Sequence, residues 1–88
     1  MNLIDKEAVI LYPLSTEKSL RLMESENTLV FVVHRKATKQ SIKEAIAHMF
    51  NAKAVKVHTH NYGATKRAYI RFAQETPAID IATNLGLM

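Results

Sequence analysis

The sequence has no cysteine or tryptophan, and only two glycines and two prolines among its 88 residues. Without cysteine, neither a disulfide framework nor a thiolate metal site can form, and a reducing compartment is permitted. With so few glycines there is no Gly-rich phosphate loop, no flexible linker and no repeat. A hydrophobic fraction of 48% in a chain of this length predicts one domain, residues 1–88, with a small core of its own.

Long apolar runs are also missing, which excludes membrane insertion, and the stretch from Met1 to Lys6 is too short and too interrupted by Asp5 for a secretion signal. No nucleophile and base pair or paired carboxylates have the spacing of an active site, so we expect no enzyme activity, no cofactor and no small-molecule substrate. His58 and His60 share a strand face, but their segment offers too few ligands for a metal. The sequence predicts a soluble cytoplasmic protein.

Positive charge, in contrast, is abundant in one half of the chain. Nine of the twelve Lys and Arg residues lie between Arg35 and Arg71, where Glu44 is the single acidic residue. This stretch carries +8, and the remainder carries −4. A local field of one sign binds phosphates. We interpret the pattern as an RNA-facing basic side and an opposite acidic side that is open to other partners.

Hydrophobic periodicity and capping residues predict the secondary structure. A short apolar edge strand at 8–12 stops at Pro13, and a helix capped by Ser15 or Thr16 follows to about Glu24. The remaining predicted elements are a central strand at 28–34, a helix from Thr38 to Asn51, a hairpin over 53–72 that turns at 61–63, and a helix capped by Thr76 and Pro77 that ends at Gly86.

Alternation predicts which residues are buried. In the first helix, Leu20 and Met23 should face inward. The second helix should bury one stripe, made of Ile42, Ala45, Ile46, Met49 and Phe50. The hairpin should have an apolar face (Val55, Val57, Thr59, Ala68, Ile70, Phe72) and a polar, basic face (Lys56, His58, His60, Arg67, Tyr69, Arg71). In the last helix the stripe should be Ala78, Ile81, Ala82 and Leu85.

The order strand, helix, strand in the middle of the chain predicts a right-handed crossover between two parallel strands. The returning hairpin strand fits between them. The residues therefore predict an α/β sandwich built on a small, mostly antiparallel sheet.

The basic turn before the second helix is one candidate phosphate site. Arg35, Lys36 and Lys39 lie at a helix start, where positive charge is unfavourable toward the helix dipole unless an anion is bound. Lys43, Lys53 and Lys56 add to this positive charge. The alternative is that these side chains only extend into water.

The basic hairpin face is the second candidate. It interleaves cations with the ring of Tyr69, a combination that holds phosphates while a base stacks. An ordinary solvated sheet face is the alternative, and Tyr69 could equally lie under another element. The full set of predicted RNA contacts is Lys18, Arg35, Lys36, Lys39, Lys43, Lys53, Lys56, His58, Lys66, Arg67, Tyr69 and Arg71.

Four segments resemble the universal large-subunit ribosomal protein family numbered twenty-three. They read YPLSTEKS at 12–19, ATKQSIKEAI at 37–46, FNAKAVKVHT at 50–59 and IATNLGLM at 81–88, and the last is similar to the archaeal, short branch of the family. Each segment is weakly specific alone, but together they cover nearly the whole chain in the family's order.

The resemblance implies a three-layer α/β/α fold with a four-stranded antiparallel sheet and no catalysis. It also implies binding to large-subunit ribosomal RNA beside the tunnel exit, next to neighbouring large-subunit ribosomal proteins. In the family, the acidic residue of the Thr-Glu-Lys motif helps form a docking surface for the signal recognition particle and other nascent-chain factors. Here that residue is Glu17, with Arg21 beside it as the second predicted docking residue. Charge alone would favour a merely solvated helix face.

The chain also departs from the family pattern. Bacterial members carry a long basic hairpin loop that reaches into the tunnel, whereas residues 61–65 here predict a compact turn. Eukaryotic members add a long basic N-terminal tail, which this sequence does not contain, and the family's Val-Asn-Thr step reads Val57-His58-Thr59.

Two other functions compete with the ribosomal one. Residues 68–72 imitate the end of a strand in the RNA-recognition motif, which suggests a single-stranded RNA-binding module, although Arg67 stands where a stacking aromatic is expected. A small phosphate-ester or acyl-phosphate hydrolase on a ferredoxin-like sheet would need an anion-cradling loop, and no Gly-rich turn is present.

Overall fold

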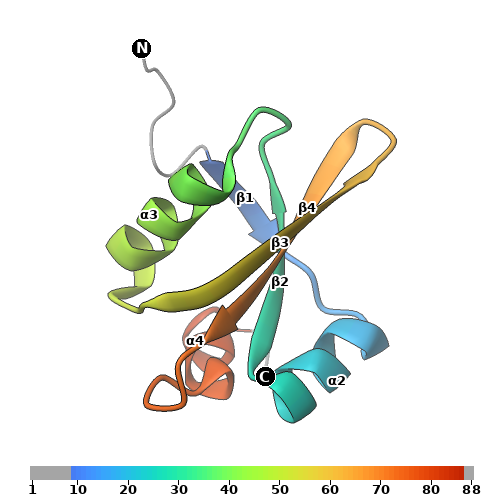
Figure 1. The fold of residues 1–88 in the computed structure, drawn as a ribbon. Coiled ribbons are helices and arrows are strands. Elements are labelled where there is room, and N and C mark those ends of the chain that lie inside the picture. Colours follow the sequence, from blue (N-terminus) through green and yellow to red (C-terminus); the bar gives the residue numbers. More distant parts are fainter. Residues whose placement is uncertain (1–8, 87–88) are drawn as a thin grey trace.

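The computed structural model describes residues 9–86. Within them it has three helices and four strands (Figure 1). In chain order they are β1 (Ile10–Pro13), α2 (Glu17–Glu26), β2 (Thr28–Val33), α3 (Lys39–Phe50), β3 (Ala54–Tyr62), β4 (Thr65–Phe72) and α4 (Ala78–Asn84). None of the helices in this described part is long and apolar enough to cross a membrane.

The four strands form one antiparallel sheet in the order β1-β2-β4-β3. Because β2 and β3 both run antiparallel to β4, they are parallel to each other, and the hairpin strand β4 fills the space between them as predicted. All six residues of β2 are buried, which confirms it as the central strand. Strand β1 is at the edge and includes Pro13, whose missing N–H is tolerated there. Ala8, predicted in this strand, lies outside the described residues.

One face of the sheet carries the apolar core. Leu29, Phe31 and Val33 of β2 lie beside Ala68, Ile70 and Phe72 of β4, and all six are buried. Helices add Met23 from α2, Ile42, Ala45 and Ile46 from α3, and Ala78, Ile81 and Ala82 from α4. The predicted α/β class with a four-stranded antiparallel sheet is confirmed.

The helices are distributed around the sheet. In Figure 1, α3 and α4 lie to the left of β2 and α2 lies to its right. Met23 of α2 nevertheless belongs to the core cluster, with Leu20 packed against it. The stacking into three separate layers therefore stays a prediction.

Local capping explains where the first two helices begin and end. Thr16 and Thr38 are the N-caps of α2 and α3, and each forms a reciprocal capping box with the serine three residues on. Asn27 and Asn51 end these helices in the left-handed conformation, with φ of 53° and 52°. The predicted caps Thr16, Thr38 and Asn51 are confirmed, while α2 continues two residues beyond the predicted end at Glu24.

The second helix differs from the prediction at Met49, which is 39% exposed instead of buried. Phe50, in the same last turn, packs against the core instead. Its ring stacks on Phe31, with centroids 5.9 Å apart. The stripe of Ile42, Ala45 and Ile46 is buried as predicted.

The hairpin differs from the prediction at two places. Asn61 and Tyr62, predicted in the turn, continue β3 and pair with Lys66 and Thr65, so the turn consists of Gly63 and Ala64. Gly63 has a φ of +59°, the reason for a glycine at the first position of a two-residue turn.

Val55 is the second difference, because it is 55% exposed instead of facing the core. The register shifts between Ala54 and Lys56, which makes Val55 an extra residue in a bulge, and Ala54 instead lies opposite Phe72 on the apolar face.

The last helix begins one residue later than predicted. Its N-cap is Pro77, which has no side-chain capping bond, and Thr76 does not cap it. The cap comes from the end of α2, because Asn27 Oδ1 accepts a hydrogen bond from the Ala78 N–H at 2.6 Å. The stripe of Ala78, Ile81 and Ala82 is buried, and Leu85 packs against the core, as predicted.

Candidate RNA interface

The face of the hairpin opposite the core is basic and aromatic. His58 lies directly across from Tyr69, His60 from Arg67, and Lys56 from Arg71. The alternation of β4 puts Ala68, Ile70 and Phe72 on the buried face and leaves Arg71 exposed and Arg67 and Tyr69 half-buried. The predicted division of the hairpin into an apolar and a basic face is confirmed, except at Val55 in the bulge.

Helix α2 and this basic face enclose a groove of about 490 Å³. Lys18, Leu22 and Glu26 line it from the helix, and their spacing of four residues puts them on one helix face. The hairpin and β2 supply the other lining residues, which are Thr28, Lys56, His58, His60, Tyr62, Tyr69 and Arg71. We call this hollow the α2–hairpin groove. It contains four of the twelve predicted RNA contacts from the hairpin and one, Lys18, from the helix.

Aromatic rings close the groove toward the hairpin turn. The hydroxyls of Tyr62 and Tyr69 are 3.4 Å apart, and the His60 ring meets the edge of Tyr69 with centroids 6.2 Å apart. The Arg67 guanidinium lies over the Tyr62 ring, 4.3 Å from its centroid. The hydrogen bond with Tyr62 raises the pKa of Tyr69, and burial raises it further, while Arg67 opposes both. Tyr69 therefore stays neutral at physiological pH, and a bound nucleic acid meets a phenol there.

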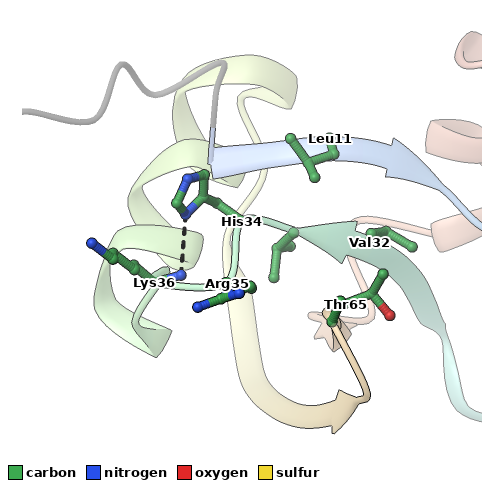
Figure 2. Close-up of a pocket in the computed structure, with 8 residues that line it drawn as sticks. Leu11, Val32, His34, Arg35, Lys36 and Thr65 are labelled. Atoms are coloured by element: carbon green, nitrogen blue, oxygen red, sulfur yellow. Dashed lines mark hydrogen bonds between the residues drawn. The ribbon is translucent and has the colours of Figure 1, made fainter.

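The basic turn between β2 and α3 lines a different hollow. Arg35 and Lys36 surround it together with Leu11, Val32, Val33, His34, Ala64 and Thr65. Figure 2 shows His34 beside Lys36, whose backbone N–H donates to His34 Nδ1 at 3.1 Å. The apolar lining residues of this hollow are Leu11, Val32, Val33 and Ala64, and Arg35 and Lys36 are exposed. These two predicted contacts are thus separate from the α2–hairpin groove.

The remaining predicted RNA contacts lie elsewhere. Lys39 is exposed on the first turn of α3, and Lys43 and Lys53 line a third hollow beside that helix. Because α3 packs on the apolar face, these lysines are across the sheet from the groove. The expectation of a single basic side is therefore wrong, since strand alternation and helix packing distribute the cations over both sides.

Lys66 also faces away from the groove. It alternates with Arg67 along β4, and its Nζ donates to the Ala37 carbonyl at 2.8 Å. This bond joins the hairpin to the segment before α3.

The two predicted docking residues, Glu17 and Arg21, are exposed on α2. At about 100° per residue, they share a helix face with Glu24 that is directed away from both the groove and the buried Ser19 and Met23. The acidic Glu26, however, belongs to the groove, so the predicted separation of acidic and basic residues is incomplete.

Sequence reasoning identified the cations, the histidines and Tyr69 of the groove but missed four participants, one of which is Thr28 at the start of β2. Leu22 and Glu26 become lining residues only because α2 lies beside the basic face, and Tyr62 was assigned to the turn. The four-residue spacing from Lys18 to Glu26 was the available signal. Among residues 9–86 no three His, Asp or Glu side chains gather closely enough to hold a metal ion.

Comparison with known proteins gives a consistent result. The sequence profile described as Ribosomal protein L23 matches residues 8–83. The large ribosomal subunit protein uL23 of Methanococcus vannielii is 45% identical over 85 residues, which are 96% of this chain and 99% of that protein.

Two longer relatives also match. The uL23 protein of Tetrahymena thermophila is 41% identical and the uL23B protein of Caenorhabditis elegans is 43% identical, each over 86 residues, or 97% of this chain. The chain spans 57% and 59% of these two relatives. The profile match covers most of the chain, and the chain therefore belongs to the ribosomal protein L23 family.

Proposed function

We propose that this chain is a structural, RNA-binding component of the large ribosomal subunit that binds ribosomal RNA beside the polypeptide tunnel exit. The α2–hairpin groove is the observation that carries the proposal. It combines Lys18, Lys56 and Arg71 with two histidines and two tyrosines in one concavity. RNA binding uses cations that contact phosphates and aromatic rings that stack on bases.

Phosphate contacts would fix the domain in position. All three cations are exposed, so each ammonium or guanidinium is accessible to a phosphate. Folded RNA is recognised mainly by its shape and backbone, because the deep groove of an A-form helix excludes side chains. Arg35 and Lys36 at the second hollow, and the lysines beside α3, would contact RNA from other directions, as expected for a domain embedded in a folded RNA.

The partners in this proposal include neighbouring large-subunit ribosomal proteins. Leu11 and Tyr12 on the edge strand β1 are 52% and 53% exposed, and apolar side chains on a strand edge suit a protein contact. The hairpin turn consists of only two residues, Gly63 and Ala64, so lining of the tunnel is not part of the proposal.

The outer face of α2 completes the proposal as a docking surface. Glu17 and Arg21 project from it, away from the groove, so a factor can bind there while the groove holds RNA. The signal recognition particle, or another factor that meets the nascent chain, is the proposed partner.

The single-stranded RNA-binding alternative receives less support. The order of elements, β-α-β-α-β-β-α, differs from the β-α-β-β-α-β order of ferredoxin-like domains. The Arg67 guanidinium lies over the Tyr62 ring, so this position does not provide an open surface for base stacking.

Sedimentation of the tagged protein from lysate through a high-salt sucrose gradient tests the proposal. At about 1 M salt the Debye length is about 3 Å, so loosely held cations release RNA, whereas a domain locked into folded RNA resists. We expect the protein to remain in the large-subunit peak. Release into the light fractions would contradict the proposal and favour a transient RNA-binding module.

A further inference from the structure

The α2–hairpin groove contains one acidic side chain, Glu26 in the last turn of α2, among Lys18, Lys56 and Arg71. A groove that bound only phosphates would gain nothing from this carboxylate, because like charges repel. Carboxylate oxygens accept hydrogen bonds, whereas the three cations can only donate them. The groove therefore offers a hydrogen-bond acceptor for a donor group and separate cations for a phosphate.

The same groove offers flat surfaces for a ring. His58 and Tyr69 are register partners on the same face of the two hairpin strands, and Leu22 lies on the helix wall. Tyr69 is held by the Tyr62 hydroxyl at 3.4 Å and by the edge contact with His60. A ring that is already positioned loses little conformational freedom when a base stacks on it.

The size of the groove limits its occupant. Its volume of about 490 Å³ is within the usual range of small-ligand sites, and it is bounded by a helix on one side and rings at one end. A base inside a duplex is stacked on both faces and shows only its edges. A single unpaired base can enter such a site and be read on its Watson–Crick edge.

We propose that the groove binds one unpaired guanine of ribosomal RNA. The base stacks on His58 and Tyr69, its ring N–H and neighbouring amino group donate to Glu26, and the adjoining phosphate contacts Lys18, Lys56 and Arg71. Guanine fits because it presents two adjacent N–H donors to the two oxygens of one carboxylate. Adenine and cytosine present one amino group on that edge, and uracil presents one imino group. This inference rests on the proposed ribosomal function and adds the base that the groove recognises.

Titration of the isotope-labelled, full-length protein with four separate nucleotides tests this. The probes are the 5′-monophosphates of guanosine, adenosine, cytidine and uridine, and backbone amide NMR shifts report the site. We expect guanosine monophosphate to bind about tenfold more tightly than the uridine nucleotide and to shift the amides of Thr28, His58 and Tyr69.

The variant Glu26→Gln separates base recognition from general electrostatics. It removes a negative charge, so a groove that attracts only phosphates would bind all four nucleotides more tightly. Recognition of guanine by the carboxylate instead predicts weaker binding of guanosine monophosphate and unchanged or tighter binding of the uridine nucleotide. Glu24→Gln makes the same charge change on another face of α2 and should leave the preference intact.

The outcomes also distinguish this inference from the proposed function. Equal binding of the four nucleotides, or shifts confined to residues outside the groove, would overturn the guanine site even if the protein sediments with the large subunit. Release of the protein from the large subunit would overturn the ribosomal function, and the guanine site in ribosomal RNA with it.

Discussion

The Asn27 side chain joins the end of α2 to the segments that frame α4. Its Nδ2 donates to the carbonyls of Phe72, Ala73 and Thr76, and its Oδ1 accepts from the Ala78 N–H. We expect Asn27→Ala to lower the free energy of unfolding by about 2 to 4 kcal/mol, because several backbone groups lose their partner at once. Urea denaturation of the variant and the parent protein measures this loss.

Asn51→Ala is the matched control for Asn27→Ala. Asn51 also ends a helix in the left-handed conformation, but in the described part of the chain its side chain has no such partners. Its replacement should cost about 1 kcal/mol, the backbone contribution alone. Equal losses in the two variants would show that conformation, and not the hydrogen bonds, makes Asn27 important.

These two asparagines also show which residues a sequence can reveal. The caps Thr16, Thr38 and Asn51 bond within their own helix, so short-range spacing predicts them. The partners of Asn27 are 45 to 51 positions away, and no local pattern identifies them. The predictions for Met49 and Thr76 were wrong for a related reason. At the end of α3, Phe50 stacks on the distant Phe31, and at the start of α4, the distant Asn27 caps the helix.

At the scale of elements, periodicity was sufficient for the seven helices and strands among residues 9–86 and for the central position of β2. It was insufficient where a residue interrupts the pattern. The bulge at Val55 shifts the alternation of β3, and nothing in the local sequence marks it.

For the candidate site, strand alternation predicted the basic hairpin face. The wall made by Lys18, Leu22 and Glu26 depends on where α2 packs, which the sequence does not specify.

The outer face of α2 gives a prediction about this element. We expect Glu17→Lys to weaken the binding of purified signal recognition particle to ribosomes that carry the variant by about tenfold, because a docking surface of reversed charge repels its partner. Incorporation into the large subunit should be unchanged, since Glu17 is directed away from the groove. Co-sedimentation of the particle with ribosomes measures both quantities.

Glu75→Lys is the control for Glu17→Lys. It makes the same charge change at an exposed position between β4 and α4. If both variants weakened binding equally, a general charge effect would explain the result. If Glu17→Lys were itself lost from the ribosome, its face of α2 would belong to the RNA interface.

For the whole molecule, the profile match over residues 8–83 shows that the chain belongs to the ribosomal protein L23 family. The resemblance predicted from the sequence is thereby confirmed, and the matched relatives are ribosomal proteins, which gives the hydrolase alternative no support. The sequence did not predict how the positive charge is arranged in space, because cations that are adjacent in the sequence lie on opposite sides of the sheet.

Two charge-reversed double variants test which side of the sheet RNA contacts. Lys56→Glu with Arg71→Glu alters the α2–hairpin groove, and Lys43→Glu with Lys53→Glu alters the hollow beside α3. We expect the groove variant to weaken binding to a large-subunit ribosomal RNA transcript at least about tenfold and to lower the slope of log affinity against log salt by about 2, one for each lost phosphate contact. Filter binding over a range of salt concentrations measures both.

The comparison is informative because both variants lower the formal net charge of +4 by the same amount. If long-range attraction to the whole domain governed RNA binding, the two variants would lose affinity and salt dependence equally. A larger loss of RNA affinity in the variant beside α3 would mean that the main interface lies on the other side of the sheet. A loss concentrated in the groove variant would mean that local geometry, and not total charge, determines how this small domain binds RNA.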